Sequence, residues 1–85
     1  PALLAMSAIL RDLALGQLAE PLGELPPPAK GLLKALTAER PDISGALKAL
    51  GELAAWLSER PHERERVLSA LAEAGAIHIA GLLRH

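Results

Sequence analysis

The sequence contains no cysteine, no phenylalanine and no tyrosine, and its single aromatic residue is Trp56. The lack of cysteine excludes disulfides and thiolate metal sites, which many small domains use to supplement a small core. The lack of aromatic residues excludes a platform on which nucleic-acid bases stack. Oligomerisation is then the remaining common way for a domain of this size to gain stability.

The chain also has no large excess of positive or negative charge. Nine Lys and Arg residues stand against ten Asp and Glu residues, which gives a net charge of -1, and the two signs are mixed along the chain. No basic surface for nucleic acid or anionic membrane is therefore predicted. No stretch approaches the roughly 18 uncharged apolar residues of a membrane span. The apolar first ten residues lack a basic leader and are followed by Arg11 and Asp12, so we expect a buried helix and a cytoplasmic protein.

What the sequence has in abundance is leucine and alanine, with few β-branched residues, a composition that favours helices. Prolines and glycines divide the chain, with Asp42 expected to cap one helix and Gly75 to end another in a left-handed turn. The helices are expected at residues 2–19, 28–38, 43–59, 61–74 and 76–84. Their short connections predict an all-α domain over residues 1–85, a compact bundle of about five short crossing helices.

The apolar residues exceed what one small core is expected to hide. Helix 43–59 has one apolar stripe that is expected to face the core, formed by Ile43, Leu47, Leu50, Ala54 and Leu57. Helices 2–19 and 76–84 are instead apolar on nearly all sides. An 85-residue domain buries only about 60% of the surface of its unfolded chain, which leaves room for about one fully surrounded helix. We therefore expect an apolar interaction surface. Its predicted residues are Leu3, Met6, Leu10, Leu53, Trp56, Ile79, Leu82 and Leu83.

Two features of helix 43–59 have competing interpretations. Trp56 either fills the core or serves as an anchor for a partner. Small residues spaced four apart, Gly45 with Ala49 and Gly51 with Ala55, would let another backbone approach closely, although such spacing is common by chance in alanine-rich helices.

Motifs for chemistry are not found. His78 and His85 are seven residues apart, which is not the close spacing of zinc ligands, and two solvent-facing histidines are the simpler interpretation. His62 lies beside Glu63 and Glu65, where an acid–base site is conceivable, but acidic residues that complement a helix dipole explain the stretch more simply. No nucleophile elbow or phosphate-binding loop occurs. We expect no enzyme activity, no cofactor and no bound metal.

The sequence thus favours a non-catalytic protein–protein interaction module that self-associates, most simply as a homodimer, through its first and last helices. One alternative is a carrier or sensor that binds an apolar small ligand among its helices. The apolar terminal helices would also be explained if these residues were part of a longer protein that covers them.

Overall fold

The computed structural model describes residues 2–20 and 23–85. Over these residues it contains five α-helices, one short 3-10 helix and no strand, which confirms the predicted all-α bundle. The elements are α1 Ala2–Leu15, α2 Pro27–Thr37, α3 Ile43–Glu59, η1 Pro61–Glu63, α4 Arg64–Glu73 and α5 Ile77–Arg84.

The first helix is shorter than predicted. It ends at Leu15 because Gly16 adopts a positive φ of 66°, a backbone conformation that favours glycine and stops a helix. The sequence predicts that this helix continues to residue 19, before Pro21, and Pro21 lies outside the described part of the chain. After Gly16 the chain runs back over the α4–α5 turn, where the Ala19 amide donates to the Ala74 carbonyl at 3.0 Å.

The two predicted caps are confirmed. The Asp42 side chain accepts a hydrogen bond from the Gly45 amide at 2.9 Å, as an N-cap of α3 should. Gly75 has a φ of 98°, and the amides of Gly75 and Ala76 donate to the carbonyls of Ala72 and Leu71. This is the Schellman pattern of a helix C-terminus, and it reverses the chain between α4 and α5.

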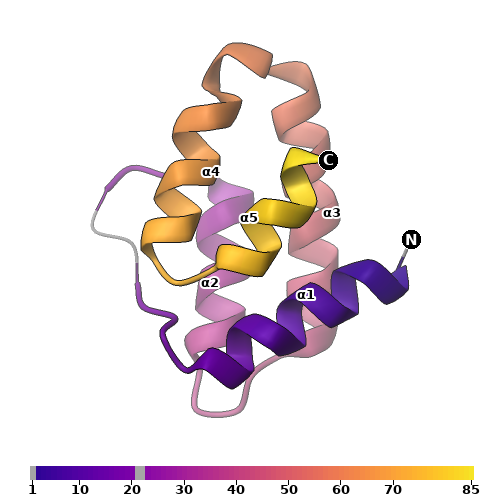
Figure 1. Cartoon of the computed structure of the whole chain (residues 1–85), viewed down its shortest axis with the longest axis vertical. Helices are drawn as coiled ribbons and strands as arrows, with labels where there is room; N and C mark the ends of the chain where they lie inside the picture. The colour runs from indigo at the N-terminus through magenta and orange to yellow at the C-terminus, as the bar shows by residue number, and fades with distance from the viewer. Residues whose placement is uncertain (1, 21–22) are drawn as a thin grey trace.

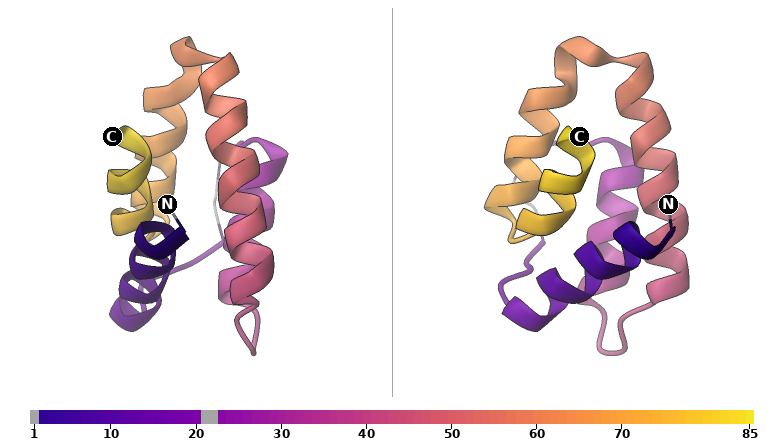
Figure 2. Two further views of the ribbon diagram at one scale, coloured as in Figure 1. Left: turned by 90° about the vertical axis from the view of Figure 1, so that its right-hand side faces the viewer. Right: turned by 45° about the vertical axis from the view of Figure 1, so that its right-hand side comes forward.

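The helices form two layers. α2 and α3 are joined by a short turn and pack against each other as an antiparallel hairpin, while α1, α4 and α5 lie on one side of that hairpin (Figures 1 and 2). α5 packs against both α1 and α4, and α1 also contacts α3. The C-terminal half of α5 faces α3 across a groove, with Leu83 on one side and Ala54 on the other.

The core lies between the layers and is built from leucine, isoleucine, valine and alanine. Fully enclosed side chains come from every helix, among them Ile9, Leu32, Leu53, Leu68 and Ile79, each 0% exposed. One carboxylate, Asp12, is also 0% exposed. In the described part of the chain, no helix combines the length and the apolar character that crossing a membrane requires.

Candidate interaction surface

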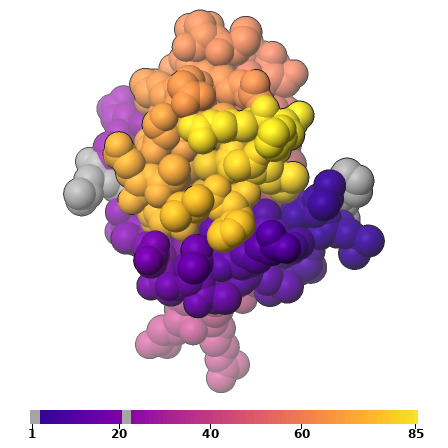
Figure 3. Space-filling model, in the orientation of Figure 1, coloured from indigo at the N-terminus to yellow at the C-terminus, as the bar shows by residue number. Residues whose placement is uncertain are grey.

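A row of leucines on α1 faces solvent. Leu3 is 83% exposed, Leu4 55%, Leu10 51% and Leu15 46%, and we call these four residues the α1 ridge. The opposite side of α1 carries Ala8, Ile9 and Asp12, all buried, so one side of the helix meets the core and the other does not. In the space-filling view α1 crosses the lower front of the molecule with no other element over it (Figure 3). Exposed apolar side chains that gather on one side of a helix usually mark an interaction site.

An apolar groove lies beside the ridge. It has a volume of about 480 Å3, is open to solvent, and is bounded by α1, α3 and α5. We call it the α1–α3–α5 groove, and its lining residues are Ala5, Leu47, Leu50, Gly51, Ala54, Leu82 and Leu83. None of these side chains has a polar group, and three of the seven residues are alanine or glycine, which leaves space between the leucines.

The α5 wall of the groove is held at its N-terminus by Asp12. The Asp12 carboxylate accepts hydrogen bonds from the backbone amides of His78, at 2.9 Å, and Ile79, at 2.8 Å. These are two of the amides that have no partner within the helix at its first turn. His78 Nδ1 lies 2.9 Å from the same carboxylate and donates to it. A residue of α1 thus caps α5, and the negative charge complements the dipole of that helix.

The other end of α5 is held by α4. Arg64 donates from Nη2 to the Leu83 carbonyl at 2.6 Å, which satisfies one of the free carbonyls at the C-terminus of α5. Arg84 and Glu65 form an ion pair at 2.9 Å beside it, on the exposed surface. Since α5 has only eight residues, these contacts from two other helices give it a defined position.

The structure separates the predicted interface residues into four groups. Leu3 and Leu10 belong to the α1 ridge, and Leu82 and Leu83 line the groove. Leu53 and Ile79 are 0% exposed in the chain's own core, so they have no surface to offer a partner, and we remove them from the interface. Met6 and Trp56 are half-buried.

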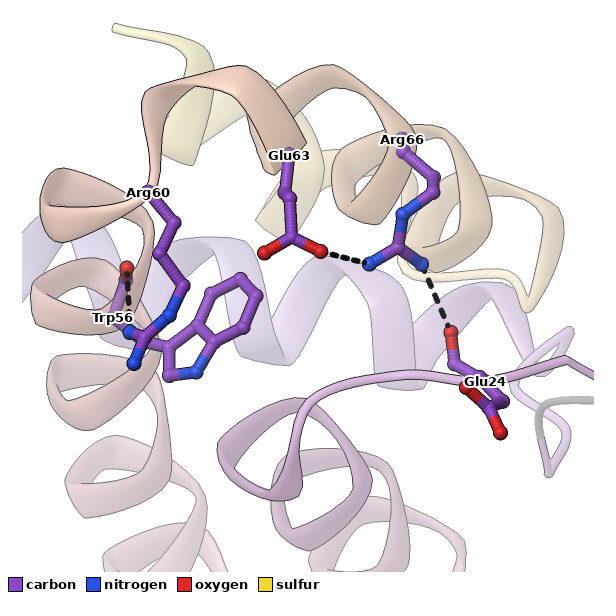
Figure 4. Close-up of polar contacts among 5 residues, drawn as sticks. All are labelled: Glu24, Trp56, Arg60, Glu63 and Arg66. Atoms are coloured by element: carbon purple, nitrogen blue, oxygen red, sulfur yellow. Dashed lines mark hydrogen bonds and ion pairs between the residues drawn. The ribbon is translucent and has the colours of Figure 1, made fainter.

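Trp56 lies at the corner between α3 and α4, in a small polar network (Figure 4). The Arg60 guanidinium lies over its ring, 4.6 Å from the centroid, and donates to the Trp56 carbonyl at 3.5 Å. Beyond it, Arg66 pairs with Glu63 at 2.8 Å and donates to the Glu24 carbonyl at 3.2 Å, which connects α4 to the segment before α2. One face of the tryptophan is therefore covered by its own chain, and the residue fits a role at this corner better than a role as an anchor.

The histidines do not form a site with other ligands in the described residues. His62 is exposed in the 3-10 turn, and the neighbouring Glu63 is paired with Arg66. His78 was expected to face solvent. Its side chain is instead only 38% exposed and is bound to Asp12. Over residues 2–20 and 23–85, no group of three or more histidine or acidic side chains is placed to hold a metal ion.

Sequence reasoning missed most of the groove. Leu47, Leu50 and Ala54 were assigned to a core-facing stripe, and Leu4 and Leu15 were not singled out. The spacing of small residues on helix 43–59 was a usable signal, because it includes Gly51, which lies in the groove wall.

The chain matches no protein-family model, and comparison with curated proteins and with solved structures gives no match. A function proposed for this chain therefore rests on its fold and on this surface.

Proposed function

We propose that this protein is a non-catalytic interaction module that self-associates through the α1 ridge and the adjoining groove. The observation that carries the proposal is the ridge itself, four exposed leucines on one side of a single helix. The cytoplasmic location expected from the sequence is part of the same proposal.

The accessible surface area of the chain also supports self-association. Its accessible surface is 5263 Å2, while a monomeric protein of 8.9 kDa typically exposes about 4,800 Å2. The fold therefore leaves more surface in water than is usual for its mass. The large apolar side chains exposed on this surface are Leu3, Leu4, Leu10, Leu15 and Ile77. Contact with a second copy that buried them would gain about 25 cal/mol per Å2 of apolar area.

We expect Leu3→Lys to dissociate the homodimer. Leu3 is 83% exposed, so the chain's own fold depends little on it, whereas burying it in a partner would contribute about 1–2.5 kcal/mol. A symmetric dimer loses that contribution twice, so the dissociation constant should rise at least about 30-fold. Light scattering behind size-exclusion chromatography measures the change.

The matched control is Ala38→Lys. Ala38 is exposed in the turn between α2 and α3, so this variant adds the same charge away from the ridge, and it should keep the mass of the native chain. Equal masses for the native chain, Leu3→Lys and Ala38→Lys over the whole concentration range would contradict the proposal.

A second candidate function is the transport or sensing of an apolar small molecule. It is favoured by the groove volume of about 480 Å3, which lies within the roughly 300–1,000 Å3 of ligand pockets. It predicts a monomer in which an alkyl ligand shifts the methyl NMR signals of Leu82 and Leu83. The openness of the groove favours the first proposal, because a bound small molecule would keep much of its surface in water.

A further inference from the structure

The groove and the ridge together suggest how two copies would associate. We propose that the homodimer is a closed two-fold pair in which the α1 ridge of each copy occupies the α1–α3–α5 groove of the other. This inference rests on the proposed function and adds the occupant of the groove and the symmetry of the complex.

Contact between two ridges alone would be too small. α1 has 14 residues and is about 21 Å long, so the outer half of a cylinder about 10 Å across has an area of about 330 Å2. A stable interface buries about 800 Å2 on each partner. If the ridge enters a groove, the walls from α3 and α5 are buried as well, and each copy contributes both a ridge and a groove.

The groove is also the right size and chemistry for leucine side chains. A cavity of about 150 Å3 accepts one benzene ring, so a groove of about 480 Å3 has room for about three side chains of leucine size. Leu3 and Leu10 are about 10 Å apart along the helix, two turns, and face the same side. The small residues Gly51 and Ala54 leave the space into which such side chains would fit.

The position of the two surfaces indicates a closed complex. The ridge reaches the groove through Leu4, which borders a hollow beside α5 together with Leu82, and Leu82 is also part of the groove wall. Adjoining surfaces can be exchanged about a two-fold axis, which uses both at once and ends the assembly at two copies. If they lay on opposite sides of the molecule, the same contact would continue into a filament.

Gly51 gives a selective test, because a Cβ added there meets no atom within 4 Å. Gly51→Leu adds a side chain to the groove wall from a Cβ that meets no neighbouring atom, and leucine is a better helix former than glycine, so the melting temperature should not fall. We expect its dimer dissociation constant to rise at least about tenfold in sedimentation equilibrium. Gly31→Leu is the matched control, since Gly31 is an exposed α2 glycine that also has no atom within 4 Å and does not line the groove.

A third variant tests whether the α1 ridge binds in a different hollow of the partner. Gly81→Leu adds the same side chain in open space on α5, in a separate hollow between α1 and α5 that includes Leu4 and His78. A dimer that survives Gly51→Leu, or one that only Gly81→Leu dissociates, overturns the inference while self-association stands. A native chain that is monomeric throughout overturns the proposed function as well. Masses that grow beyond the dimer with concentration overturn the two-fold arrangement.

Discussion

Asp12→Ala is expected to lower the free energy of unfolding by about 3–5 kcal/mol, because it removes the acceptor of two backbone amides at the start of α5. Each buried donor that loses its partner costs about 1–3 kcal/mol, and the Asp12 side chain is fully buried. For a domain of this size the change corresponds to a fall in melting temperature of at least about 12 °C. Circular dichroism during thermal unfolding measures it.

Two variants test whether the loss of stability in Asp12→Ala comes from the position of Asp12 at the start of α5. Asp42→Ala removes an exposed N-cap with a single hydrogen bond to Gly45, and should cost only about 1 kcal/mol. Asp12→Asn keeps the shape and one acceptor oxygen but turns an amide group toward the second donor, so its effect should be intermediate. A melting temperature for Asp12→Ala equal to that of Asp42→Ala would show that Asp12 does not hold α5.

Gly75→Ala is the second substitution with a large expected effect, about 2–5 kcal/mol of lost stability. Gly75 has a φ of 98°, which any residue with a side chain adopts only under strain. A Cβ there would overlap the backbone carbonyl of Gln17, so the segment that crosses the α4–α5 turn would have to move. The hydrogen bond from the Ala19 amide to the Ala74 carbonyl would be disturbed with it.

Gly16→Ala separates the strain from the overlap. Gly16 also has a positive φ, 66°, but a Cβ there meets no atom within 4 Å, so only the strain of about 1–2 kcal/mol applies. Urea unfolding of the two variants gives the comparison. If Gly75→Ala were no less stable than Gly16→Ala, close packing of residues 17–19 on the turn would not be a feature of the fold.

Local signals in the sequence were sufficient for the helices and their ends. The helical segment that begins at Pro61, the cap at Asp42 and the left-handed turn at Gly75 depend on residues close together in the sequence, and the structure has all three. The end of α1 was placed four residues too late, because a glycine inside an apolar stretch does not by itself distinguish a helix end from a tolerated glycine.

Features that join distant residues were not predictable in the same way. Asp12 was taken as a charge on a terminal helix, and its role depends on residues 66 and 67 positions away. The wrong interface prediction for Leu53 and Ile79, which lie in the core, has the same cause. Hydrophobic periodicity gives the apolar side of a helix but not the surface that covers it. The expectation of excess apolar surface needed only composition and length, and the exposed leucines of α1 fit it.

The central claim is self-association of the chain, and its most direct test is the mass of the native protein by sedimentation equilibrium from about 1 µM to about 1 mM. We expect a mass that rises from that of one 8.9 kDa chain toward twice that value and stops there. A mass that stays at one chain across the whole range would contradict it.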